Sequence, residues 1–98
     1  MVQVLITLLA NPDEPEALAA YKKQATVIRD SYGAELLFRM NAGARIVGDF
    51  AEESVRILQF PSLDHLHGWL NDPRYLEIIP LRDKGYRKVT ITVLEPVG

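Results

Sequence analysis

Cysteine is absent from this 98-residue chain, and histidine and tryptophan are scarce, with two histidines and one tryptophan. Without thiols the chain cannot form a disulfide, a thiolate metal site, an iron–sulfur cluster or a cysteine nucleophile. Any chemistry performed by this protein must therefore rest on carboxyl, hydroxyl, imidazole, amine or guanidinium groups.

Long apolar runs and an excess of one charge are also missing. The apolar stretches are much shorter than the ~20 residues needed to span a bilayer, so no membrane partner is expected. The formal net charge is -2 and the basic residues are dispersed, so no nucleic-acid partner is expected. The opening MVQVLITLL has neither the basic segment nor the cleavage site of a signal peptide, which favours a cytoplasmic location.

Glycine patterns that bind phosphate are absent as well. Neither GxGxxG nor a Walker sequence occurs, so we expect no phosphate-containing cofactor, and we predict no cofactor of another kind. The remaining composition, with 48% apolar and 24% charged residues, is typical of a globular chain. We interpret residues 1–98 as a single domain.

Hydrophobic periodicity predicts the secondary structure. Residues 2–9, 34–40, 54–60 and 87–94 alternate as strands do, and a short extended piece is predicted at 45–50. A helix with an inward stripe of Leu18, Tyr21, Ala25, Ile28 and Tyr32 separates the first two strands and should stop at Gly33.

Capping residues define the predicted helix ends. Asp13 and Glu16 fit a capping box for the first helix. Ser62 should cap a second helix with Leu63, Leu66 and Leu70 inward, and Asp72 with Pro73 should start a third.

The order of these elements predicts a ferredoxin-like α+β fold, βαββαβ, with an antiparallel sheet and the helices on one face. The other face is mixed, with polar Gln3, Thr7, Arg39, Thr90 and Thr92 among apolar residues. Those apolar residues are Leu5, Leu9, Leu37, Val55, Ile57 and Leu94. This face favours burial against a second copy, giving a homodimer that forms an α/β barrel, with the chain itself as its partner.

Three segments, YGAELLFRMNAG, GDF and FPSLDHLHGWLNDPRYLEIIPLR, together resemble domain-of-unknown-function family 1330 of the dimeric α/β-barrel superfamily. The resemblance covers roughly Tyr21 to Arg82 and rests on the order and spacing of many positions. These are Tyr21, Gly33, Arg39, Gly48, Phe60, Pro61, Ser62, Trp69, Pro73, Tyr75, Leu81 and Arg82. It implies the fold and the dimer more strongly than a function.

Some positions depart from that family pattern. Ala34 replaces a glycine, Phe50 replaces a tryptophan, and Val47 stands where the family usually has a glutamate. An acid or base role carried by that glutamate therefore has no counterpart at position 47.

Two residues are our candidates for catalysis. His67 lies one turn after Leu63, beside the predicted buried stripe, and could transfer a proton; the alternative is a helix-face histidine held by a hydrogen bond. Arg82 could hold an acidic group of a substrate or form a structural ion pair. His65 and His67 project about 200° apart on a helix, so they do not predict a metal site.

Four further residues are candidates for ligand binding. Arg39 could bind a carboxylate, and Tyr21, Trp69 and Tyr75 could form the wall of a pocket or simply pack in the core. Three hypotheses follow. The chain is a small-molecule enzyme acting on a small acidic or aromatic metabolite, a binding module without catalysis, or a purely structural homodimer.

Overall fold

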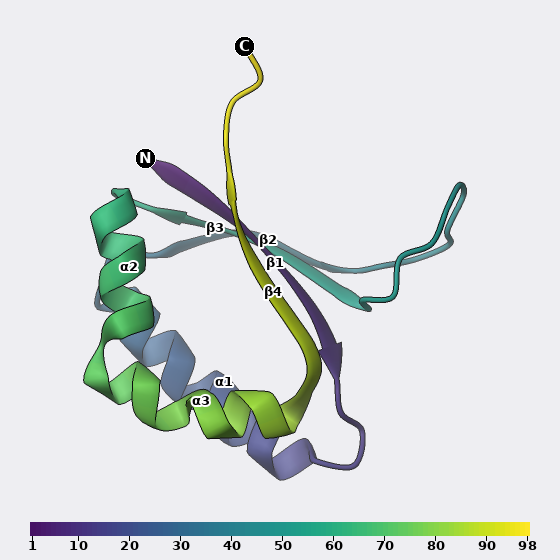
Figure 1. Cartoon of the computed structure of the whole chain (residues 1–98), viewed down its shortest axis with the longest axis horizontal. Helices are drawn as coiled ribbons and strands as arrows, with labels where there is room; N and C mark the ends of the chain where they lie inside the picture. The colour runs from purple at the N-terminus through teal and green to yellow at the C-terminus, as the bar shows by residue number, and fades with distance from the viewer.

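The computed structural model describes residues 1–98. Its elements in chain order are β1 (Val2–Ala10), α1 (Pro15–Asp30), β2 (Glu35–Asn41), β3 (Ser54–Phe60), α2 (Leu63–Asn71), α3 (Pro73–Gly85) and β4 (Tyr86–Leu94), as drawn in Figure 1. This confirms the predicted order of strands and helices, including the division of the second helical region at Asp72.

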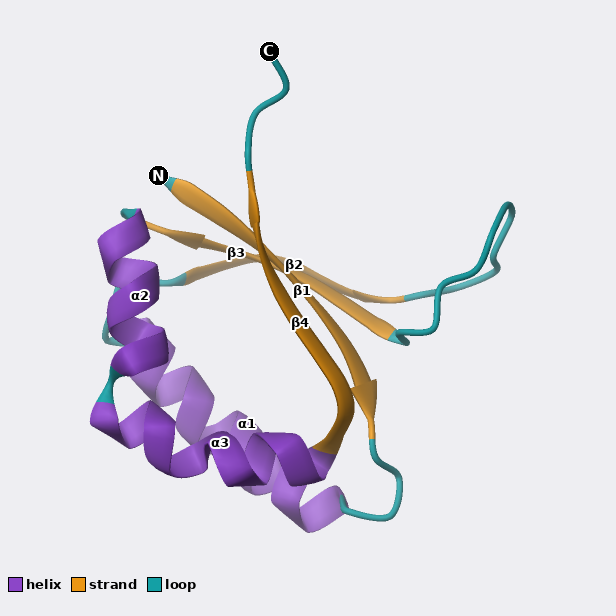
Figure 2. Ribbon diagram, viewed as in Figure 1, coloured by secondary structure: helices purple, strands orange, loops and turns teal.

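The four strands form one antiparallel sheet in the order β2-β3-β1-β4. All three helices lie on one side of this sheet, and the chain leaves the other side uncovered (Figure 2). Neither the length nor the apolarity of any helix suffices to span a lipid bilayer.

The core lies between the sheet and the helices. Because side chains alternate along a strand, Val4, Ile6 and Leu8 of β1 all face the helices and are buried. They pack with buried residues of the neighbouring elements, which are Tyr21, Ala25, Ile28, Leu58, Phe60, Leu66, Trp69, Tyr75, Ile78 and Tyr86. Gly85 allows α3 to approach α1, because an added Cβ would lie 2.8 Å from the Leu18 backbone.

Two of the predicted helix caps are confirmed. The Ser62 hydroxyl accepts the His65 N–H at 3.2 Å, and the Asp72 carboxylate accepts the Arg74 N–H at 2.8 Å. Pro73 occupies the first position of α3, where its missing N–H costs nothing.

The predicted capping box of α1 is wrong. Asn11 organises a turn in which its side chain accepts the Asp13 N–H at 3.1 Å and its carbonyl accepts the Glu14 N–H at 3.1 Å. This turn delays the helix, so Glu14 becomes the N-cap, without a side-chain hydrogen bond. At the other end α1 stops at Asp30, and Gly33 takes the predicted left-handed conformation in the turn that follows, with φ 75°.

A β-bulge in β2 changes which face its residues occupy. The register against β3 shifts between Leu36, which pairs with Leu58, and Phe38, which pairs with Ile57. Beyond the bulge Phe38 and Met40 therefore lie on the uncovered face, whereas Arg39 lies opposite Arg56 on the helix side. Our prediction that Arg39 projects onto the mixed face is wrong, because strict alternation does not survive an extra residue.

The segment between β2 and β3, residues 42–53, forms an arm that projects away from the body of the protein (Figure 1). The extended piece predicted at 45–50 is not a strand; Arg45 instead donates hydrogen bonds to the carbonyls of Gly43, Phe50 and Glu52 within the arm. The base of the arm is held by the buried Glu52, whose carboxylate pairs with the Lys88 ammonium at 2.7 Å.

Candidate functional site

The fold brings four of the predicted site residues together between α1, α3 and the sheet. The Tyr21 and Tyr75 hydroxyls are 2.9 Å apart, and Arg82 donates from Nη1 to the Tyr75 hydroxyl at 3.2 Å. Burial, and then the neighbouring Tyr75, raise the pKa of Tyr21, so this hydroxyl keeps its proton. Another nitrogen of the Arg82 guanidinium, Nε, donates to the Asp83 carboxylate at 3.1 Å.

Trp69 completes this aromatic group. Its ring stacks on the Phe60 ring with the two centroids 5.6 Å apart. The centroid of the Tyr75 ring lies 5.0 Å from that of Trp69. The indole Nε1 is buried and has no hydrogen-bond partner. A buried indole N–H normally has an acceptor, so Trp69 offers a free donor in the core.

His67 does not join this group, and its ring is exposed to solvent. The buried face of α2 is formed by Leu66 and Trp69. At ~100° per residue His67 points about 160° away from Trp69, so the predicted position beside the buried stripe is wrong. Leu63, which we predicted to face inward, is likewise 45% exposed. A proton-transfer role for His67 stays a prediction.

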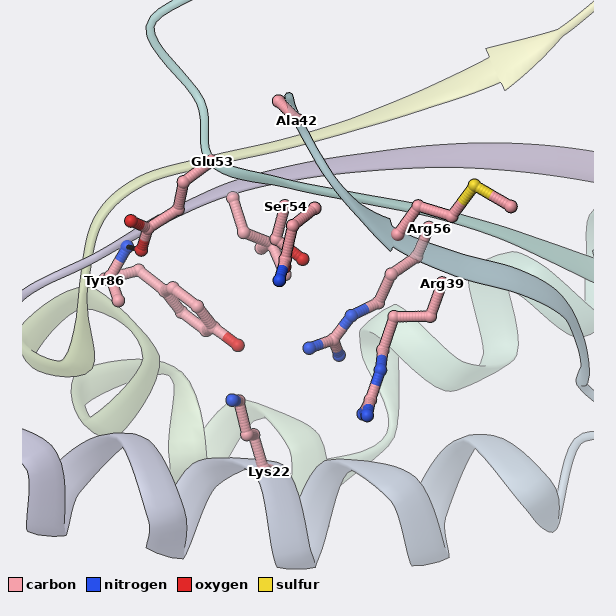
Figure 3. A pocket seen from close by; sticks show the side chains of 11 residues that line it. Lys22, Arg39, Ala42, Glu53, Ser54, Arg56 and Tyr86 are labelled. Atoms are coloured by element: carbon pink, nitrogen blue, oxygen red, sulfur yellow. Dashed lines mark hydrogen bonds between the residues drawn. The ribbon is translucent and has the colours of Figure 1, made fainter. Parts of the chain in front are cut away.

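Arg39 belongs to a different group, which the sequence did not lead us to expect. It meets Arg56 of β3 and Lys22 of α1 around an open pocket of about 630 Å³. Figure 3 shows Arg39 and Arg56 reaching from the sheet towards α1, from which Lys22 points back at them. The full lining is Leu8, Ala10, Lys22, Arg39, Met40, Asn41, Ala42, Glu53, Ser54, Arg56 and Tyr86.

The three cations of this pocket lack anionic partners. None of the six ion pairs of the structure includes Lys22, Arg39 or Arg56. The Arg56 side chain is partly enclosed, and its Nε is buried without a hydrogen-bond partner. Burial lowers the pKa of Arg56, and burial followed by the nearby Arg56 and Arg39 lowers the pKa of Lys22. The pocket therefore favours an anion that would pair with these groups.

Glu53 and Tyr86 supply the acid–base groups of the same pocket. One Glu53 carboxylate oxygen accepts the Ala10 N–H at 3.0 Å, which fixes this side chain at the pocket edge. The Tyr86 hydroxyl points into the pocket towards Lys22 and Arg56 (Figure 3). Burial raises the pKa of Tyr86, and Arg56 partly opposes that shift, so the hydroxyl is protonated at neutral pH and can donate a proton.

A small inner cavity of about 30 Å³ shares lining residues with both the cationic pocket and the aromatic group. Its lining includes Arg56 and Tyr86 of the cationic pocket and Tyr21 and Trp69 of the aromatic group. A volume of this size suits one ordered water or the end of a ligand. The unpartnered donors of Arg56 and Trp69 both belong to residues that line this cavity.

Sequence reasoning missed Lys22, Glu53, Arg56 and Tyr86. A signal existed for Arg56, because it shares its strand parity with the buried Leu58 and Phe60, where an arginine is unexpected. Lys22 directly follows the inward-facing Tyr21. Glu53 and Tyr86 lie at the boundaries of strands, and their convergence depends on the tertiary fold.

No three histidine, aspartate or glutamate side chains come close enough together to hold a metal ion. The ionisable groups of the pocket are its three cations, its carboxylate and its phenol.

Comparison with known proteins gives a family and a fold. A family model described as "Domain of unknown function (DUF1330)" matches residues 4–96. No curated protein matches the sequence.

Several solved structures share the architecture. RPA0582 of Rhodopseudomonas palustris, a protein of unknown function, is 20% identical with a TM-score of 0.84, over 99% of this chain and 82% of that one. An antibiotic biosynthesis monooxygenase is 13% identical with a TM-score of 0.67, over 100% of both chains. A dabb family protein with a ferredoxin-like fold, from Mesorhizobium loti, is 10% identical with a TM-score of 0.68, over 99% of this chain and 97% of that one. At these identities the likeness establishes the ferredoxin-like α+β fold.

Proposed function

This chain belongs to the family described as a domain of unknown function (DUF1330), and we propose that it is an enzyme that binds and converts a small acidic metabolite between α1 and the sheet. A structural neighbour described as an antibiotic biosynthesis monooxygenase supports an enzymatic role for this fold. Fold alone does not assign a reaction, so the proposal rests on the pocket.

The observation that carries the proposal is the state of Arg56. A guanidinium nitrogen is buried without an acceptor, and two further unpaired cations, Lys22 and Arg39, face the same space. Leaving a buried polar group unpaired costs about 1–3 kcal/mol, and more for a charged one. A carboxylate in the pocket would supply the missing acceptor.

The arginine side chains and the volume of the pocket suit a small organic carboxylic acid. Arginine side chains present a planar fork that matches a carboxylate with two parallel hydrogen bonds. The pocket of about 630 Å³ is in the range of small-molecule sites. Glu53 can accept a proton from the bound molecule and Tyr86 can donate one, which are the functions that a converting enzyme needs beyond binding.

Arg82 and the three aromatic residues that the sequence predicted as site residues do not bind the carboxylate in this proposal. Arg82 is already engaged by Tyr75 and Asp83. Tyr21 and Trp69 line the inner cavity, and Tyr75 contacts both of them. In our proposal they hold the inner wall, while Arg39 and Arg56 bind the ligand.

The test is ligand-dependent thermal stability with a matched pair of arginine variants. Mono- and dicarboxylic acids should raise the melting temperature of the wild type, since a ligand at 100 times its Kd stabilises by about 2.7 kcal/mol. Arg56→Met should remove the response. Arg87→Met, at an exposed arginine of β4, should keep it. The proposal fails if no acid stabilises the wild type or if Arg56→Met responds as the wild type does.

Mass spectrometry of the stabilising acid after incubation separates the remaining alternatives. A chemical change in the acid supports the enzyme. Binding without any change supports a non-catalytic binding module, and the absence of binding supports a purely structural homodimer.

We also propose that two copies associate through the uncovered sheet face to form a dimeric α/β barrel. Leu5, Val55 and Ile57 line the middle of this face, and Phe38, Met40 and Leu94 are 37%, 63% and 37% exposed on it. Apolar side chains gathered on an uncovered sheet face, among polar ones, are typical of an interface, and a two-fold axis lets one such face cover itself.

A further inference from the structure

Lys22 lies on the opposite side of the pocket from Arg39 and Arg56. It rises from α1, whereas Arg39 and Arg56 reach down from β2 and β3 (Figure 3). A carboxylate paired with the guanidinium groups of Arg39 and Arg56 would lie between the sheet and α1. The rest of the ligand would then extend across the pocket towards the Lys22 amine.

From this arrangement we propose that Lys22 is a nucleophile that forms an imine with a 2-oxo acid whose carboxylate is bound by Arg39 and Arg56. The inference rests on the proposed function, because it needs the arginines to bind the carboxylate. In a 2-oxo acid the carbonyl carbon is bonded directly to the carboxylate, so fixing the carboxylate also fixes the electrophile.

The surroundings of Lys22 favour the neutral amine that such a reaction requires. Partial desolvation at the pocket lowers the pKa of the Lys22 amine, and the positive charges of Arg56 and Arg39 lower it further, while Glu53 opposes the shift. A lysine beside other cations is a known way to make an amine nucleophilic. Lys22 also lacks a carboxylate partner that would hold it in the charged form.

The step balances without an oxidant, a reductant or a cofactor. The nitrogen lone pair of Lys22 forms a bond to the carbonyl carbon while the C=O π bond breaks, and a proton moves from the nitrogen to that oxygen, giving a carbinolamine. The nitrogen then loses a proton, the carbinolamine hydroxyl gains one, and the C–O bond breaks to release water and leave a C=N bond. The Tyr86 hydroxyl points towards Lys22 and can relay the proton between these two atoms.

Lys23 provides a matched control in the adjacent position. It is exposed like Lys22, but it does not line the pocket. Any reaction that reflects only a solvent-accessible amine should affect both lysines equally. A reaction that depends on the pocket should select Lys22.

The experiment is reductive trapping of the full chain with phenylpyruvate, pyruvate or 2-oxoglutarate and cyanoborohydride, followed by peptide mass spectrometry. The hydride reduces the C=N bond, so a trapped lysine gains the mass of the acid less one oxygen atom. Because a bound carboxylate raises the local concentration of the carbonyl, Lys22 should carry about tenfold or more adduct than Lys23. Lys22→Arg should abolish this adduct and Lys23→Arg should leave it unchanged.

A parallel measurement distinguishes failure of this inference from failure of the proposed function. Phenyllactate has a hydroxyl in place of the carbonyl, so it reports carboxylate binding alone through the melting temperature. Stabilisation by phenyllactate that depends on Arg56, without a trapped adduct on Lys22, overturns the imine and leaves the proposed function standing. The absence of both stabilisation and adduct overturns both, and equal labelling of Lys22 and Lys23 also overturns the imine.

Discussion

Tyr75 shows how one hydroxyl can bond to two neighbouring side chains, the buried Tyr21 and the half-buried Arg82. Its side chain is 1% exposed, and its oxygen lies 2.9 Å from the Tyr21 hydroxyl and 3.2 Å from Arg82 Nη1. All three groups come from helices α1 and α3, so the hydroxyl joins the two helices at the centre of their contact.

Tyr75→Phe should therefore destabilise the protein by about 1–3 kcal/mol, because the Tyr21 hydroxyl and the Arg82 guanidinium lose a buried partner. Urea unfolding measures this as a lower midpoint with an unchanged slope. The double variant Tyr21→Phe with Tyr75→Phe should lose less than the sum of the two single variants, since the pair shares one hydrogen bond. Additive losses would contradict the contact.

Arg56 and Arg39 show what single-residue patterns could and could not predict. An arginine at an inward-facing strand position could have been recognised from the sequence around Leu58 and Phe60 as a partly buried charge. Arg39 could not be placed in the same way. Its strand gains an extra residue at the bulge after Leu36, and no residue there identifies the bulge in advance.

At the scale of elements, the junction of α2 and α3 depends on Asp72. Its carboxylate accepts hydrogen bonds from the Arg74 backbone at 2.8 Å and the Arg74 Nε at 3.1 Å, and from the Tyr32 hydroxyl at 2.7 Å. The hydrogen bond from the Arg74 side chain, followed by that from Tyr32, holds the pKa of Asp72 well below its usual range. The junction is thus tied to the turn that follows α1 through a charged group.

This low pKa predicts a loss of stability in acid. A carboxyl whose folded pKa lies below its unfolded value, about 3.9, contributes its full stability above that value. The contribution is lost as the pH falls from about 5 towards the folded pKa. Asp72→Asn keeps a good N-cap but removes the charge. The melting temperature of the wild type should therefore exceed that of Asp72→Asn at pH 7, and the difference should shrink at pH 3.

Asp49→Asn is the control for this measurement, because Asp49 is an exposed aspartate of the arm and makes no side-chain hydrogen bond or ion pair. Its melting temperature should follow that of the wild type at both pH values. A difference between wild type and Asp72→Asn that stays constant from pH 7 to pH 3 would show that the charge of Asp72 does not stabilise the junction.

The elements themselves could be predicted well from local chemistry. Ser62, Asp72 and Pro73 fixed the ends of α2 and α3 because each acts on backbone groups within its own turn. The start of α1 was predicted wrongly for the opposite reason. Asn11 there competes for the backbone N–H groups and forms a turn before the helix begins.

At the scale of the whole molecule, the helices cover only one face of the sheet. The bulge in β2 increases the apolar character of the other face, because it turns Phe38 and Met40 outward to lie opposite Ile57 and Val55. Convergence of Lys22, Arg39 and Arg56 is also a property of the whole fold, since each comes from a different element. Neither feature could be read from any single segment of the sequence.

Met40 and Val27 form a matched pair for testing the proposed dimer, because they are 63% and 64% exposed but lie on opposite sides of the protein, on β2 and α1. The wild type should have a mass near twice 11.0 kDa by light scattering after size exclusion. Met40→Glu should shift the population to the monomer, because burying an unpaired carboxylate in an interface is costly. Val27→Glu adds the same charge on the helix side and should remain dimeric. A monomeric wild type, or a Met40→Glu variant that stays dimeric, would contradict burial of the uncovered sheet face.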